Sequence, residues 1–321
     1  MAVVSRARKQ GLTVRLQDII QAISITELSQ LAKFSASKPR QIQETTEAFP
    51  PSPIQKLYFQ SAVGHNGPSR FNQSITVRLS VGVELYRMQD AIRAIVCRHG
   101  MLRARFGKSP EGVWQQRITK DIESSYRFRT HVIESSRGIK SKTSETQLSL
   151  DIANGPILGT DLFNIAGEGQ VLFLVACHLC IDMVSWRVVL QDLEELLQKG
   201  LIASERPLSF QTFNATREGS QNQLELVNQP ANTAYWGAKN LTNTYGQVKT
   251  ESFVLDKETT GLVLGQLHES FQTEPVDLLL AASFRSFSET FTDRSLPVIY
   301  TESHGRQPSA DSTIDASGTI G

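Results

Sequence analysis

The sequence contains no long hydrophobic run. The longest uninterrupted apolar stretch, Val171 to Cys177, has the length of a strand, whereas a membrane-spanning helix needs about 20 apolar residues. The first ten residues carry Arg6, Arg8 and Lys9 and are not followed by the apolar core of a secretory leader. We therefore expect neither a membrane partner nor export.

Cysteine is scarce, with Cys97, Cys177 and Cys180 the three in the chain. Three thiols cannot form a disulfide framework, which predicts a cytoplasmic protein. Cys177 and Cys180 form a C-x-x-C, but a zinc site would need two further ligands, and the third cysteine stands alone beside His99. A redox pair would follow a strand and open a helix, whereas this pair lies within an apolar run. We favour buried thiols and expect no metal.

Excess charge of either sign is also lacking. The chain has 33 Lys and Arg against 32 Asp and Glu, so its formal net charge is +1. This balance argues against nucleic acid as a partner. The hydrophobic share of 40% is that of a globular protein, and 321 residues allow two domains or one two-lobed unit.

Helix and strand patterns alternate along the chain. Apolar spacing predicts two short helices within residues 13–34, and the polar segment 35–47 reads as a linker. Further elements are predicted as strands at 75–79, 171–177 and 297–301, and as helices at 85–96, 184–197 and 276–291. Such interleaving indicates an α/β fold.

The most informative segment runs from the buried strand through a polar turn into the helix, over residues 176–186. His178 at the end of this strand is suited to general acid or base chemistry near neutral pH. Asp182, four residues later, can brace the turn. The alternative from the pattern alone is a buried histidine that hydrogen-bonds a backbone group.

This segment resembles the H-H-x-x-x-D-x-x-S-W signature of the condensation and epimerization domains of nonribosomal peptide synthetases. His178 takes the second histidine position, Asp182 the aspartate, and Ser185 and Trp186 the final pair; Cys177 replaces the first histidine. Further segments are similar to motifs of this superfamily in the expected order: P-I-Q-K-L-Y-F at 53–59, F-N-Q-S at 71–74, H-G-M-L-R-A-R-F at 99–106, Y-W at 235–236 and D-L-L-L at 277–280.

Residues 302–307 read E-S-H-G-R-Q and resemble the E-G-H-G-R-E motif of epimerization domains, which ordinary condensation domains are not expected to carry. The resemblance implies that Glu302 and His178 are the catalytic pair. Supporting residues would be Asp182, Cys177, Ser185, Trp186, His304 and Arg306. An alternative for Glu302 is an ion pair with Arg306.

The first 35 residues resemble the C-terminal tail of a peptidyl carrier domain that lacks its phosphopantetheine serine. The implied organisation is a carrier tail at 1–35, a linker at 36–48, an N-terminal lobe at 49–210 and the truncated start of a second lobe at 211–321. The implied fold is a chloramphenicol-acetyltransferase-like pseudo-dimer of two α/β sandwich lobes, the second incomplete.

The implied activity is epimerization of a carrier-bound L-aminoacyl or peptidyl thioester at Cα. The substrate would arrive on the phosphopantetheine of a carrier domain, so we expect that partner, neighbouring synthetase domains and no cofactor bound by this chain. Two alternatives stay open: a condensation domain that forms peptide bonds, and an inert fragment that only docks a carrier.

Overall fold

The chain divides into two compact units, Met1–Val227 with His304–Gly321, and Asn228–Ser303. The computed structural model describes residues 7, 12–14, 22, 24–34, 44–61, 71–203, 205–217, 234–237, 248–299, 306 and 316–321.

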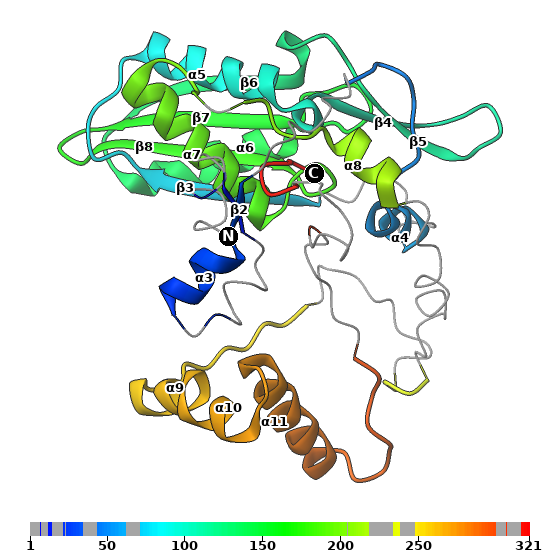
Figure 1. The fold of residues 1–321 in the computed structure, drawn as a ribbon. Coiled ribbons are helices and arrows are strands. Elements are labelled where there is room, and N and C mark those ends of the chain that lie inside the picture. The colour runs from blue at the N-terminus through cyan, green and yellow to red at the C-terminus, as the bar shows by residue number, and fades with distance from the viewer. Residues whose placement is uncertain are drawn as a thin grey trace. The chain divides into compact units, whose positions relative to one another are not determined.

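The first unit is built on a four-stranded mixed sheet in the order β3-β8-β7-β6 (Figure 1). The strands are β3 (Asn72–Arg78), β6 (Tyr126–Ile133), β7 (Leu158–Ile165) and β8 (Gly169–Cys177). β8 pairs antiparallel with both of its neighbours, and β6 pairs parallel with β7. The apolar run of the sequence is therefore a central strand.

Helices cover both faces of this sheet. Leu172, Leu174 and Ala176 of β8 belong to a core shared with α5 (Leu85–Arg98) and α7 (Met183–Lys199). Val171, Phe173 and Val175 belong to a second cluster, against which Ile139 of α6 (Ile139–Leu148) packs. Because alternate side chains of a strand point to opposite faces, a strand buried on both sides is apolar at most of its positions, as β8 is from Val171 to Cys177.

Smaller elements complete the unit. They are β1 (Leu12–Thr13), α3 (Ile25–Leu31), β2 (Lys33–Phe34), α4 (Pro53–Ser61), the hairpin of β4 (Ala104–Lys108) and β5 (Trp114–Ile118), α8 (Phe210–Arg217), and three 3-10 turns, Gly100–Arg103, Glu123–Ser125 and Ser136–Gly138. Ile320, near the end of the chain, is buried in the core shared with α5 and α7.

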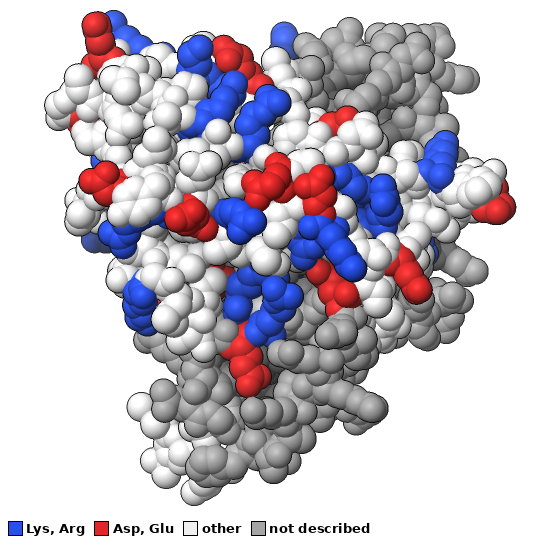
Figure 2. Space-filling model, turned by 90° about the horizontal axis from the view of Figure 1, so that it is seen from above, with Lys and Arg blue, Asp and Glu red and all other residues white. Residues whose placement is uncertain are grey.

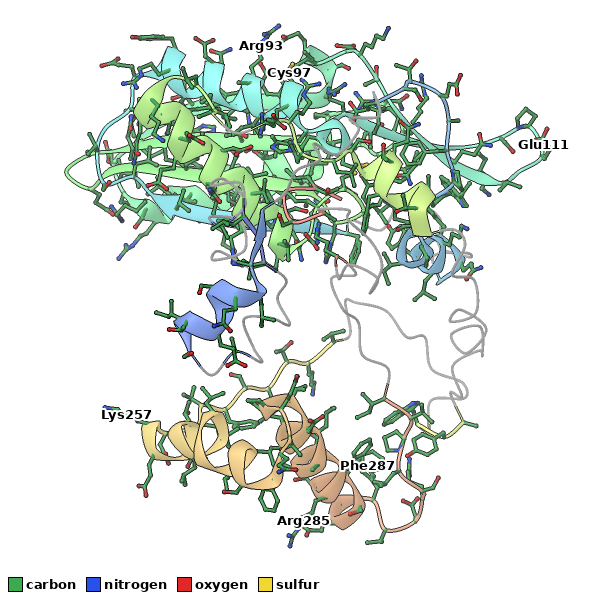
Figure 3. The ribbon with its side chains drawn as sticks, in the orientation of Figure 1. Arg93, Cys97, Glu111, Lys257, Arg285 and Phe287 are labelled. Carbon is green, nitrogen blue, oxygen red and sulfur yellow. The ribbon has the colours of Figure 1, made fainter. Side chains whose placement is uncertain are left out.

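The regular secondary structure in the described part of the second unit is helical, with α9 (Lys257–Leu264), α10 (Gln266–Phe271) and α11 (Pro275–Thr290). Phe287, labelled on α11 in Figure 3, is the centre of an aromatic cluster. Its ring centroid lies 6.4 Å from that of Tyr235, 6.0 Å from Trp236 and 4.7 Å from Phe291. Arg294 adds a cation over the Tyr235 ring at 5.8 Å.

Most of the predicted elements are confirmed. β3, β8, α5, α7 and α11 match the five predicted strands and helices between 75 and 291 to within three residues at each end. α3 confirms the second of the two N-terminal helices, and the first lies largely outside the described residues. The predicted domain limits at residues 35, 48 and 210 stay predictions.

The strand predicted at Pro297–Thr301 is wrong over its described part, because residues 297–299 have no regular structure. A strand requires a hydrogen-bonding partner, Pro297 cannot donate to a ladder, and the described residues of this unit form helices and turns. Alternating apolar side chains alone were not enough to predict a strand here.

Two surface observations agree with the composition. On the face shown in Figure 2, Lys and Arg side chains are interspersed with Asp and Glu side chains. Arg93 and Glu123 form an exposed ion pair, at 2.7 Å. Within the described residues, every helix is too short or too polar to cross a bilayer.

Candidate functional site

The turn between β8 and α7 presents His178 at the end of the sheet. The backbone N–H of His178 donates to the Phe71 carbonyl oxygen at 2.7 Å and so extends the β3–β8 ladder by one bond. The N–H of Cys180 donates to the Cys177 carbonyl oxygen at 2.9 Å, which closes the turn. The β3–β8 pair of the sheet thus holds the backbone of His178.

The His178 ring is half-buried and has a partner on each nitrogen. Nδ1 lies 2.8 Å from the Ile181 carbonyl oxygen. A carbonyl only accepts, so Nδ1 carries the proton and Nε2 of the neutral ring carries the lone pair. Nε2 lies 2.9 Å from the side-chain nitrogen of Gln73, and the ring stacks on Phe71 at 4.6 Å between centroids. The ring is therefore fixed with a basic nitrogen at the strand end.

Asp182 lies in the turn and hydrogen-bonds the start of α7. Its Oδ1 accepts from both the backbone N–H and the hydroxyl of Ser185, each at 2.7 Å, which makes it the N-cap of α7. Burial raises its pKa, but hydrogen bonds from Arg306 and Ser185 outweigh burial, so the pKa of Asp182 lies below its usual value. The carboxylate is thus held in its charged form.

Arg306 forms a bidentate ion pair with Asp182. Nη2 donates to Oδ1 at 3.0 Å, and Nη1 donates to Oδ2. Nη2 also donates to the Ser185 hydroxyl at 3.0 Å, and Nε to the Thr319 carbonyl oxygen at 3.2 Å. The Arg306 side chain is only 2% exposed. A buried guanidinium with this many acceptors is fixed in position, and it ties residue 306 to the turn after His178.

The two thiols of the C-x-x-C are free and buried. A hydrogen bond with Cys180 lowers the pKa of Cys177, whereas burial raises the pKa of Cys180. Among the described residues, no group of three or more His, Cys, Asp or Glu side chains could hold a metal ion. The Cys177 side chain is buried in the core, and in the sequence it stands where the resembled signature has its first histidine.

Ser185 and Trp186 lie in the first turn of α7 and are buried. Trp186 packs in the core on the α5 and α7 side of the sheet. Its indole Nε1 is buried without a hydrogen-bond partner among the described residues. The Ser185 hydroxyl donates to Asp182 and accepts from Arg306. Ser185 therefore links the first turn of α7 to this ion pair. The remaining predicted residues, Glu302 and His304, lie outside the described residues.

Two glutamines at the turn were not nominated from the sequence. Gln55 is 2% exposed, and its side-chain nitrogen donates to the Leu179 carbonyl oxygen at 2.7 Å. Its Oε1 accepts from the backbone N–H of Ser52 at 2.8 Å and from Gln116 at 2.9 Å. Gln55 and Gln73 belong to the motif segments at 53–59 and 71–74. Their place in these motifs was the sequence feature that could have identified them as site residues.

The sequence of the chain is similar to known proteins of one family. Residues 45–321 match the condensation domain family. The whole chain is 49% identical to part of nonribosomal peptide synthetase 1 of Aspergillus fumigatus and 47% identical to part of nonribosomal peptide synthetase nlsA of Emericella nidulans. In both cases, the chain spans about 5% of the relative's length.

Solved structures show the same fold. The epimerization domain from the third module of tyrocidine synthetase B is similar with a TM-score of 0.68 at 23% identity, over 89% of this chain and 67% of that one. The condensation domain of the Monacolin K polyketide synthase MokA is similar with a TM-score of 0.58 at 13% identity, over 77% and 60%. The predicted α/β fold of condensation and epimerization domains is confirmed, and the chain belongs to the condensation domain family.

Proposed function

We propose that this chain epimerises an aminoacyl or peptidyl group at Cα while a carrier domain of a nonribosomal peptide synthetase holds that group as a thioester. The observation that carries the proposal is the ion pair between Arg306 and Asp182. It links the segment that resembles the epimerization motif to the turn that carries His178. Arg306 is the arginine of that motif, and Glu302 is its glutamate.

The pairing of Glu302 with His178 rests on the resemblance of residues 302–307 to the epimerization motif. From that resemblance we infer that Glu302 and His178 act on one substrate. Arg306 of the same segment donates to Asp182, which follows His178 by four residues, and this contact supports the inference.

The chemistry requires a base and an acid on opposite faces of Cα. A thioester carbonyl acidifies the Cα hydrogen because the electron pair of the broken C–H bond delocalises into an enolate. One residue accepts that proton, and the other donates a proton to the opposite face of Cα, which inverts the centre. His178 Nε2 carries the lone pair suited to accept a proton, and Glu302 would supply the second group.

Peptide-bond formation is the second candidate. It is supported by the match of residues 45–321 to the condensation domain family. In this reaction, His178 Nε2 would orient or deprotonate the attacking amine of an acceptor substrate, and Glu302 would have no chemical role. A third possibility, docking of a carrier without chemistry, is an outcome of the same experiment.

The test uses the natural protein that contains these residues, with its carrier loaded with an L-aminoacyl thioester in deuterated water. We expect deuterium at Cα and a mixture of L and D products. His178→Ala and Glu302→Gln should each lower the exchange rate by at least about 100-fold, since general acid–base catalysis contributes about 10² to 10⁴. Glu289→Gln is the matched control, because Glu289 pairs with Arg285 on the exposed side of α11.

The three functions give different results. Peptide product without Cα exchange, lost in His178→Ala but kept in Glu302→Gln, would favour condensation. Carrier binding with neither exchange nor peptide product would leave docking alone. Equal exchange in the wild type and in both variants would refute the proposed epimerization.

A further inference from the structure

We propose that Gln73 is a positioning residue that pairs with His178 in both of its protonation states, by turning its side-chain amide. The inference deepens the proposed function, because it describes how the fold supports a histidine that gains and loses a proton. It begins from the contact between the side-chain nitrogen of Gln73 and Nε2 of His178, at 2.9 Å.

The direction of this hydrogen bond follows from the other side of the ring. Nδ1 must donate to the Ile181 carbonyl oxygen, at 2.8 Å, so neutral His178 has only a lone pair at Nε2. The amide nitrogen of Gln73 is a donor and fits that lone pair. Gln73 thereby helps to hold the ring in a single tautomer, with its basic nitrogen toward β3.

The other end of the amide is unsatisfied. Oε1 of Gln73 is buried and has no hydrogen-bond partner among the described residues. A buried acceptor without a partner destabilises a fold, because it has lost its hydrogen bonds to water and gained none in return. Half a turn of the amide would bring Oε1 to the place of the nitrogen, where it can accept from Nε2–H of the imidazolium ring. Protonation of His178 would thus give the unpaired oxygen a partner.

The charged and titratable groups around His178 are paired with one another, so Gln73 is the residue that can hydrogen-bond Nε2. Asp182 is paired with Arg306, and Cys177 with Cys180, so the titratable groups at this turn have partners of their own. Phe71 stacks on the face of the imidazole and leaves its edge to Gln73. Among neutral side chains, an amide offers a strong donor and a strong acceptor that can exchange places.

Proton transfer fits the same arrangement. Nε2 has one lone pair, so a Cα proton can reach it only after the Gln73 amide has moved aside. The C–H bond then breaks, the N–H bond forms at Nε2, and the electron pair moves into the thioester enolate. Oε1 of Gln73 can accept from the new N–H until the proton leaves again.

The first test uses nitrogen NMR on the wild-type 321-residue chain and needs no substrate. A scalar coupling across the N–H···N hydrogen bond should join Gln73 and His178 when the ring is neutral, and should disappear when the ring is protonated. A coupling that persists at low pH, or that is absent at high pH, would overturn the inference.

The second test separates a turning amide from one that only donates. Gln73→Met removes the amide. If the amide donates to the neutral ring and accepts from the imidazolium, its loss should move the titration midpoint of the His178 ring to lower pH by about 0.5 to 1 pH unit. The imidazolium loses the stronger of the two hydrogen bonds, because hydrogen bonds to charged groups are stronger than neutral ones. Gln73→Glu should move the midpoint up by about 1 to 2 pH units. A shift to higher pH in Gln73→Met would mean that the amide only donates, and would refute the proposal.

Gln115→Met is the matched control, since Gln115 lies on β5, paired with Gly107. In this variant the titration midpoint of the His178 ring should equal that of the wild type. If Gln73 variants move the midpoint as expected while His178→Ala leaves Cα exchange unchanged, the inference stands and the proposed epimerization fails.

Discussion

Asp182 has two structural tasks, and the structure allows them to be separated. It caps α7 through Ser185, and it neutralises the buried guanidinium of Arg306. Asparagine is as good an N-cap as aspartate but carries no charge. Substitutions at this position can therefore remove the ion pair alone, or the ion pair and the cap together.

We expect Asp182→Asn to lower the free energy of unfolding by about 1 to 3 kcal/mol, because it leaves Arg306 buried without a counter-charge. The Asp182 side chain is 25% exposed, so the loss should stay below that of a fully buried pair. Asp182→Ala should cost about 1 kcal/mol more, since the cap is lost as well. Urea denaturation measures both.

The control is the double mutant with Arg306→Met, which removes the guanidinium. Asp182→Asn should be much less damaging in that background than in the wild type. Additive losses would show that the ion pair contributes nothing to stability. The depressed pKa of Asp182 also means that its contribution is present above about pH 4 and is lost as the pH falls through its folded pKa.

Among the secondary-structure elements, α5 and α7 are joined by a buried polar contact as well as by their apolar faces. Nε2 of His99, at the C-cap of α5, lies 2.7 Å from Oδ2 of Asp192 on α7. Because a carboxylate only accepts, Nε2 carries the proton in this contact. The His99 side chain is 2% exposed, and burial lowers its pKa even though Asp192 opposes that effect.

This contact predicts a pH dependence of stability. The unfolded chain protonates His99 near its ordinary pKa of about 6.5, whereas the folded protein resists protonation. More protons are then bound in the unfolded state, so the free energy of unfolding should fall as the pH drops below about 6.5. Urea denaturation at pH 7.5 and pH 5.5 should show a larger loss for the wild type than for His99→Gln, which retains a donor but does not titrate. Equal losses would contradict the prediction.

Local sequence accounts for much of α7. Asp182 caps its start, and Gly200, with a φ of 74°, ends it in the left-handed conformation that glycine adopts without strain. The apolar spacing over 184–197 predicts the buried face that Trp186, Val189 and Leu193 form. At Pro297 the same kind of reasoning failed, because a strand depends on a partner that short-range periodicity does not report.

Across the whole chain, the two units differ in how deeply their secondary-structure elements are buried. β7 and β8 are hydrogen-bonded on both sides and buried on both faces. α9 and α11 have no buried residue. Isolated helices of this length are marginally stable in water, because most helical stability comes from packing.

Hydrogen exchange measured by mass spectrometry should reflect this difference. Peptides from β7 and β8 should exchange only by global unfolding, whereas peptides from α9 and α11 should exchange at least about 100-fold faster through local opening. The hairpin of β4 and β5 is the internal control, since its strands pair with each other and have few further backbone hydrogen bonds, so its exchange should be intermediate. Protection of α11 equal to that of β8 would show that its exposed face is covered in solution.

Local sequence patterns predict five of the longer helices and strands and the turn at His178. Apolar runs, helical spacing and capping residues act over a few residues, so a linear reading recovers them. The long-range partners come from the three-dimensional fold: Arg306 contacts Asp182 across 124 positions, and Gln73 contacts His178 across 105. Contacts over such separations depend on strand order and register, which β8 sets by pairing with β3, and local patterns carry no record of that pairing.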